Sequence, residues 1–141
     1  MYRVRKQFKA EIAHILESAH SKCCTDCIHG HSYVFEVVLK SKTLNADDMV
    51  TDFGLVKSWV VPMIEEWDHA LVVSSLHSNL IDLYRSYRKV REIRGNPTAE
   101  NMARVLFEMI KDSMIRANSD VQVESVRVHE TSTGWAEYSE E

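Results

Sequence analysis

His29 and His31 have the clearest capacity for chemistry, because they flank Gly30 in a His-Gly-His motif. Alternate residues of a β-strand point to the same face, so two imidazoles at this spacing can hold one metal ion. His14 ends an earlier alternating stretch, on the same side as its apolar residues. If the two strands pair, three histidines meet and leave a fourth tetrahedral position open, which is the pattern of catalytic zinc.

A cysteine-rich stretch, Cys23-Cys24-Thr25-Asp26-Cys27, directly precedes this motif. A thiolate beside Zn²⁺ can act as a base or a nucleophile, and Cys24 and Cys27 are the candidates. The alternative is a structural zinc knuckle, in which both thiols join the two imidazoles of the His-Gly-His motif as four ligands. Three clustered cysteines also make a poor disulfide framework, which favours a cytoplasmic location.

Two carboxylates lie beside residues that could share their chemistry. Asp68 precedes His69, and a carboxylate can orient an imidazole and stabilise its charged form, as a proton relay requires. Glu130 precedes Thr131 at the end of an expected strand, where its carboxylate could accept two parallel hydrogen bonds from a ring that presents N–H and NH₂ groups. His129 should face away from Glu130, because neighbouring strand residues point to opposite faces.

Alternation of apolar and polar residues predicts the strands that position these groups. Residues 2–14 place apolar side chains and His14 on one face, and residues 31–40 repeat the pattern from His31 onward. Three further stretches are expected to form strands: 89–94, 121–130 and 134–138.

Two helices are expected from apolar residues at helical spacing. The first covers about 53–66 with Asp52 as its N-cap, and Pro62 inside it predicts a kink or an early stop. The second begins at Asn96-Pro97-Thr98, with either end of that tripeptide as its cap. Residues 70–86 show no clear period and could hold a short helix. This order favours an α+β domain with an antiparallel sheet and helices packed on one face.

Length and charge exclude several classes of function. The 141 residues fit a single domain, 1–141, with one core. The net charge of −4, with interleaved signs, argues against a nucleic-acid binder, which would carry a basic patch or stripe. No run approaches the roughly 20 apolar residues that span a bilayer, and the N-terminus leads into an alternating stretch rather than a signal peptide.

In this order, these motifs resemble the 6-pyruvoyl-tetrahydropterin synthase / 6-carboxy-tetrahydropterin synthase family. Each block alone is weak, whereas the ordered set is specific and covers nearly the whole chain. The blocks are Phe8-x-Ala10-x-x-Ala13-His14, the cysteine-rich stretch, His29-Gly30-His31-Ser32-Tyr33, Met49-Val50-x-Asp52-Phe53, Asp68-His69-Ala70-Leu71, Asn96-Pro97-Thr98-Ala99-Glu100-Asn101 and Val128-His129-Glu130-Thr131.

The resemblance implies the tunnelling fold (T-fold), a four-stranded antiparallel sheet with two long helices packed on one face. It also implies a homohexamer built as a dimer of trimers. Zinc would be bound by His14, His29 and His31, and the substrate would be the small-molecule pterin 7,8-dihydroneopterin triphosphate. A cysteine thiolate and the Asp68-His69 pair would move protons.

By the same resemblance, Glu130 would anchor the pterin ring with Thr131 beside it. A neighbouring subunit would help to line the pocket with Thr98, Ala99 and Glu100. In many relatives the catalytic cysteine lies four residues before the His-Gly-His motif, where this chain has Thr25. Cys24 lies five residues before this motif, one residue earlier than Thr25, and is the first candidate for the catalytic cysteine. Cys27 is the second candidate and Cys23 the third.

Two products are compatible with the resemblance. Members of the queuosine branch release acetaldehyde and triphosphate and leave 6-carboxy-tetrahydropterin, whereas animal-type members make 6-pyruvoyl-tetrahydropterin. The short loop between His14 and His29 and the Gly-Asn-Pro-Thr-Ala-Glu-Asn stretch favour the queuosine branch. A non-catalytic pterin-binding module on the same fold is the alternative from another class.

Overall fold

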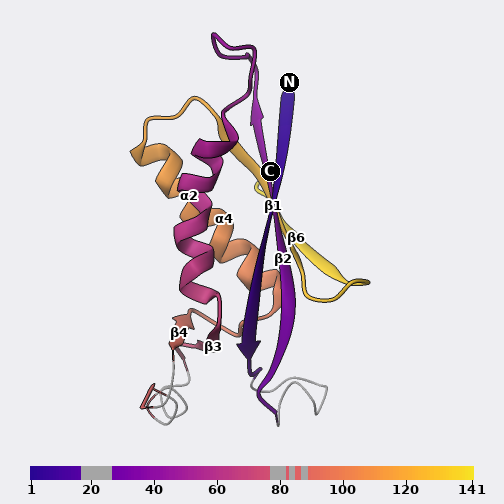
Figure 1. The fold of residues 1–141 in the computed structure, drawn as a ribbon, viewed down its shortest axis with the longest axis vertical. Helices are drawn as coiled ribbons and strands as arrows, with labels where there is room; N and C mark the ends of the chain where they lie inside the picture. The colour runs from indigo at the N-terminus through magenta and orange to yellow at the C-terminus, as the bar shows by residue number, and fades with distance from the viewer. Residues whose placement is uncertain (17–26, 77–81, 83–84, 87–88) are drawn as a thin grey trace.

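The computed structural model describes residues 1–16, 27–76, 82, 85–86 and 89–141. Within these residues the chain forms a six-stranded sheet with two helices on one of its faces (Figure 1). The strand order across the sheet is β4-β3-β1-β2-β5-β6. The strands are β1 (Tyr2–His14), β2 (His29–Ser41), β3 (Ala70–Ser74), β4 (Val90–Ile93), β5 (Gln122–His129) and β6 (Trp135–Tyr138), and the helices are α2 (Phe53–Trp67) and α4 (Ala99–Arg116).

The antiparallel centre of the sheet is confirmed. β1 and β2 pair along their whole length, from Tyr2 opposite Ser41 to His14 opposite His29. β5 pairs antiparallel with β2, and β6 pairs antiparallel with β5. These four strands are the antiparallel set that the T-fold requires; β1, β2 and β5 follow the predicted alternation, and β6 falls in the stretch 134–138 expected to be a strand.

The sheet has two more strands than the four that the family resemblance implies; β4 is the strand expected at 89–94, whereas β3 was not expected as a strand. β3 pairs parallel with β1, and β4 pairs parallel with β3, so the complete sheet is mixed. All five residues of β3 are buried, and a continuous buried run shows no alternation by which a strand could be recognised. The short helix considered for 70–86 is therefore wrong for 70–74, and most of the remainder lies outside the described residues.

Both helices begin where expected. The Asp52 carboxylate accepts a hydrogen bond from the Gly54 N–H at 2.6 Å, and the Thr98 hydroxyl accepts one from the Asn101 N–H at 3.2 Å. Thr98 rather than Asn96 is thus the cap of α4. The early stop at Pro62 is wrong, because α2 continues to Trp67 and its buried stripe runs through the proline position.

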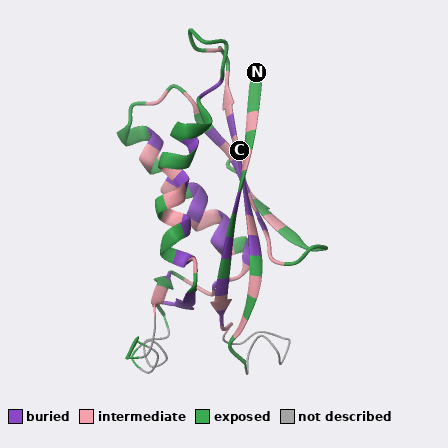
Figure 2. Cartoon of the chain, viewed as in Figure 1, coloured by how far each residue is buried: buried purple, intermediate pink, exposed green. Residues whose placement is uncertain are grey.

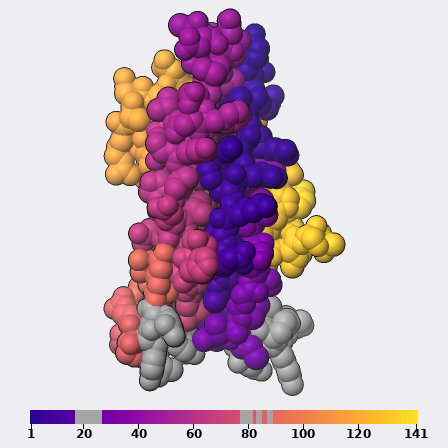
Figure 3. Space-filling view, viewed as in Figure 1, coloured from indigo at the N-terminus to yellow at the C-terminus, as the bar shows by residue number. Residues whose placement is uncertain are grey.

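The core lies between the helices and one face of the sheet, where the buried colours of Figure 2 face one another. Val60 of α2 and Leu106 of α4 pack with Phe35 and Val37 of β2, all fully buried or nearly so. β1 and α2 lie side by side along the molecule in the space-filling view (Figure 3). Among the described residues, neither helix combines the length and apolarity that crossing a membrane requires.

Candidate metal centre and proton relay

His14 is the most deeply buried residue of the candidate metal centre. It ends β1 on the core side and is 0% exposed. Its Nδ1 lies 2.8 Å from the Pro97 carbonyl oxygen, just before the cap of α4, and 3.1 Å from the Tyr33 hydroxyl. A carbonyl can only accept, so Nδ1 carries the proton and Nε2 keeps its lone pair. Metal-binding histidines are oriented by this kind of hydrogen bond.

His29 faces His14 across the β1–β2 pair and is oriented in the same way. Its Nδ1 donates to the Cys27 carbonyl oxygen at 3.2 Å, so its Nε2 also keeps a lone pair. The two Nε2 atoms lie 3.0 Å apart. Two lone pairs at this separation repel each other unless a proton or a metal ion lies between them, so the pair is a candidate for metal binding.

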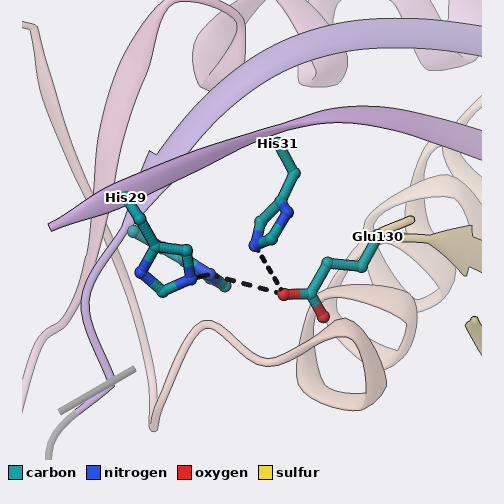
Figure 4. Close-up of side chains that lie close together, drawn as sticks. His29, His31 and Glu130 are labelled. Carbon is teal, nitrogen blue, oxygen red and sulfur yellow. Dashed lines mark hydrogen bonds and ion pairs between the residues drawn. The ribbon is translucent and has the colours of Figure 1, made fainter. Parts of the chain in front are cut away.

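His31 and Glu130 complete the cluster from neighbouring strands. The His31 Nε2 is buried, finds no hydrogen-bond partner among the described residues and lies 2.8 Å from Glu130 Oε1. The same carboxylate oxygen lies 3.5 Å from His14 Nε2. Figure 4 shows His29, His31 and Glu130 converging on one point, and the ligand atoms of the four residues all lie within 4.8 Å of one another.

The donor set fits zinc. Ligands about 2.0 to 2.2 Å from a tetrahedral ion lie roughly 3.3 to 3.6 Å from one another. Three of the pairs here lie 2.8, 3.0 and 3.5 Å apart, so small side-chain movements would admit an ion. Burial lowers the pKa of His14, against an opposing contribution from its hydrogen bond to Pro97, and so favours the neutral imidazole that a metal needs. Three imidazoles and one carboxylate are ligands that zinc accepts.

The position of Glu130 extends the prediction from sequence, which assigned this residue to catalysis and ring binding and not to the metal. Its carboxylate also lies within the histidine cluster. The signal was available in the sequence, because Val128 and Glu130 alternate onto the face that carries His31 once β5 pairs with β2. His129 faces the opposite side, as expected, with its Nε2 3.9 Å from the buried Glu36 carboxylate.

Asp68 and His69 form the expected pair at the end of α2. Asp68 Oδ2 lies 3.1 Å from His69 Nδ1, and Asp68 Oδ1 accepts the Glu11 N–H at 2.8 Å. The Glu11 carbonyl in turn accepts the His69 N–H at 2.6 Å, and His69 takes a positive φ of 56° at this turn. The Glu11 N–H, with help from His69, lowers the pKa of Asp68 and keeps its carboxylate ionised.

One cavity adjoins both the relay and a single residue of the metal cluster. A cavity of about 470 Å³ is lined by both His31 and His69, together with Glu11 and Lys89. The imidazole of His69 is exposed, so it can reach a molecule that enters this space. His69 at the end of α2 and one candidate metal ligand, His31, therefore line the same cavity.

A smaller cavity of about 190 Å³ adjoins Glu130 and contains Thr131, Ala99 and Glu100. The start of α4 thus reaches the Glu130 side of the site within a single chain, while its contribution to a neighbouring subunit stays a prediction. The Thr98 hydroxyl accepts the capping hydrogen bond from Asn101, and the Thr131 hydroxyl accepts one from the Gly134 N–H.

The cysteine assignments are tested only in part. Cys23 and Cys24 lie outside the described residues, and so does the knuckle that Cys24 would help to form. Cys27 is a free, exposed thiol, and its backbone carbonyl, not its sulfur, contacts His29. Within the described residues the metal cluster contains His14 and Glu130 and excludes Cys27.

Comparison with known proteins now identifies the family. A family model described as 6-pyruvoyl tetrahydropterin synthase matches residues 3–141. The chain belongs to the 6-pyruvoyl tetrahydropterin synthase family. This family membership agrees with the ordered blocks in the sequence and with the antiparallel sheet and two helices of the structure.

Two curated relatives illustrate this part of the family. The 6-carboxy-5,6,7,8-tetrahydropterin synthase of Aquifex aeolicus is 36% identical over 89% of this chain and 80% of its own length. The protein of the same name from Haemophilus influenzae is 28% identical over 99% of this chain and all of its own length. Both alignments extend over nearly the whole tetrahydropterin synthase domain.

Solved structures confirm the fold of the family. An uncharacterized protein from Wolinella succinogenes superposes with a TM-score of 0.82 at 23% identity and covers 99% of this chain and 98% of its own. The 6-pyruvoyl tetrahydropterin synthase of Caenorhabditis elegans gives a TM-score of 0.73 at 21% identity over 99% of this chain and 96% of its own. At these identities the likeness concerns the fold alone.

Proposed function

We propose that the chain is a 6-carboxy-5,6,7,8-tetrahydropterin synthase. It converts 7,8-dihydroneopterin triphosphate and water to 6-carboxy-tetrahydropterin, acetaldehyde and triphosphate, and supplies queuosine-type deazapurine synthesis. The observation that carries the proposal is the convergence of His14, His29, His31 and Glu130 on one point, with His69 lining a cavity that His31 also lines. The curated relatives of A. aeolicus and H. influenzae carry the name of this activity.

Zinc would be the resident metal, bound by His14, His29 and His31. When bound, it supplies Lewis acidity that polarises the hydroxyls of the substrate side chain and acidifies the neighbouring C–H and O–H bonds. The hydrogen bonds from His14 to Pro97 and from His29 to Cys27 fix the imidazoles with Nε2 turned inward.

Asp68 and His69 would carry protons to and from the substrate. With Nδ1–H donating to Asp68, the Nε2 of His69 holds a lone pair that can take a proton from a molecule in the cleft. The ionised Asp68 then stabilises the imidazolium that forms. The same group can return the proton to another atom of the substrate, as a reaction with several proton transfers requires.

Glu130 would bind the pterin ring through its carboxylate, with Thr131 beside it. The carboxylate lies between the metal cluster and the small cavity lined by Ala99 and Glu100. A ring bound there would hold its side chain close to the three imidazoles. Anchoring a substrate in this way converts part of its binding energy into correct orientation.

A thiolate from the cysteine-rich stretch would be the second proton-transfer group, with Cys24 the first candidate and Cys27 the second. Separate Cys24→Ser and Cys27→Ser variants distinguish them. Loss of turnover in one variant, with its metal content intact, identifies the active sulfur. Unchanged product formation by both variants would contradict the thiolate role.

The decisive experiment is incubation of the zinc-loaded protein with 7,8-dihydroneopterin triphosphate, followed by mass analysis. We expect 6-carboxy-tetrahydropterin together with acetaldehyde and triphosphate. Formation of 6-pyruvoyl-tetrahydropterin would move the chain to the animal-type activity. Binding without turnover would instead favour the non-catalytic pterin-binding module.

Assembly and location follow from the same proposal. We expect a cytoplasmic homohexamer, arranged as a dimer of trimers, with active sites between subunits. Sedimentation or light scattering of the zinc-loaded protein measures the oligomer directly, and a monomer with full activity would contradict an active site shared between subunits.

A further inference from the structure

Lys89 contacts the Asp68–His69 turn and is not itself one of the proposed catalytic residues. Its Nζ donates to the Asp68 carbonyl oxygen at 3.0 Å and also to the Glu65 carbonyl oxygen. These carbonyls lie at the C-terminal end of α2, a helix with no basic residue in its own last turn. A cation at this end satisfies carbonyls that lack a helical partner and complements the helix dipole.

The backbone of Lys89 fixes the other side of the same turn. Its carbonyl oxygen accepts the Leu71 N–H at 2.9 Å, where β4 begins to pair with β3. Lys89 therefore contacts the residue before His69 through its side chain and the second residue after His69 through its main chain. The main chain of Glu11 contacts Asp68 and His69 from β1.

These contacts from Lys89 and Glu11 matter because His69 is in an unfavourable backbone conformation. A φ of 56° is uncommon for a residue with a side chain and is kept only when the surroundings enforce it. His69 is also exposed, so little side-chain packing holds its imidazole in place. The contacts of its neighbours must supply the restraint.

We propose that Lys89 is a positioning residue for the proton relay. It holds the Asp68 backbone at the end of α2 and thereby keeps the His69 imidazole facing the cleft that also contains His31. This role rests on the proposed function, because it gives His69 a task in catalysis. Lys89 itself touches no other group of the relay or the metal cluster in the contacts described above.

Arg91 provides a matched control. It lies in β4, two residues after Lys89, and contacts the same end of α2, with its Nε 2.5 Å from the Glu66 carboxylate. Its contact is with a side chain and leaves the carbonyls of Glu65 and Asp68 untouched. Arg91→Met thus removes a cation from the same interface without releasing the turn.

The experiment compares Lys89→Met, Lys89→Arg and Arg91→Met in the zinc-loaded protein. For Lys89→Met we expect kcat with 7,8-dihydroneopterin triphosphate to fall by about tenfold or more, with KM and metal content unchanged. Hydrogen exchange of the His69 amide should accelerate, because its bond to Glu11 is loosened. Lys89→Arg should restore much of the wild-type kcat and of the slow exchange at His69. Arg91→Met should change neither kcat nor the exchange rate.

Three results would overturn the proposal: full kcat in Lys89→Met, a loss of kcat without faster exchange at His69, or the same losses in Arg91→Met. The last would indicate general destabilisation of the interface. If the wild-type protein turns over no pterin, the proposed function fails, and the exchange rate of the His69 amide still decides whether Lys89 restrains the turn.

Discussion

His129 and Glu130 are neighbours in the chain, and their side chains lie on opposite faces of the sheet. The Glu130 carboxylate lies 2.8 Å from His31 Nε2 on the face that the helices cover. His129 turns to the other face, where its Nε2 lies 3.9 Å from the Glu36 carboxylate. One peptide bond therefore separates a residue of the metal cluster from an imidazole on the other face of the sheet, and His129 is a natural control for the histidines of the site.

The first prediction concerns the metal. Replacing His31 with alanine removes one of three imidazoles, so zinc per chain should fall from about one to near zero after dialysis against a weak chelator. His129→Ala should keep its full metal content. Elemental analysis of the purified variants measures both values. Equal zinc in the two variants would refute the assignment of His31 as a ligand.

The second prediction separates the two contacts of Glu130. Glu130→Gln keeps the shape of the side chain and loses the charge, so the three imidazoles should still hold zinc. Pterin affinity should weaken by about tenfold or more, because an amide cannot accept two parallel hydrogen bonds from the ring. Titration with a non-hydrolysed pterin, alongside metal analysis, tests this. Loss of zinc with unchanged pterin affinity would make Glu130 a metal ligand rather than a ring anchor.

The third prediction concerns Asp68. Asp68→Asn removes the charge that stabilises the His69 imidazolium, and we expect kcat to fall by about a hundredfold or more. Zinc content should remain near one per chain, since the pair contacts no ligand of the cluster. Steady-state kinetics with parallel metal analysis gives both numbers. A variant that keeps wild-type kcat would remove the relay from the mechanism.

The fourth prediction is the pH dependence of the metal-free protein. Burial lowers the pKa of His14 in the folded state, whereas an unfolded histidine titrates near 6.5. The unfolded chain then binds more protons below about pH 6.5, so this contribution to stability is complete above that value and is lost as the pH falls toward the lowered pKa.

Urea midpoints of the metal-free protein at pH 7.5 and pH 5.5 measure this effect. The decrease in stability between the two should be smaller in His14→Gln, which has no proton to gain at that position. If His14→Gln shows the same decrease as the wild type, burial of this imidazole does not govern the acid response.

The chemistry of the site was largely readable from the sequence, since it depends on local patterns. The alternation of β1 and β2 sets the faces of His14, His29 and His31, and adjacency alone suggests the Asp68–His69 pair. The capping residues Asp52 and Thr98 were equally local. Each of these predictions needs only the period of an element and the type of one side chain.

The features that could not be predicted from the sequence depend on contacts between distant segments of the chain. β3 was missed because a strand buried along its whole length has no polar alternation, and only its pairing with β1 reveals it. The contact of Lys89 with Asp68 spans 21 residues and follows from the parallel addition of β4. Nothing in the local pattern around Lys89 indicates that its side chain would reach the end of α2.

The pairing of His14 with His29 in the first hairpin has a consequence for folding fidelity. Because side chains alternate between faces, a shift of one residue between these strands would turn the imidazoles of one strand away from those of the other, along with the apolar residues of that strand. A chain that misaligns this hairpin therefore loses its core and its affinity for metal together. Metal uptake during refolding would then measure the fraction of the protein in which these two strands have paired in the correct register.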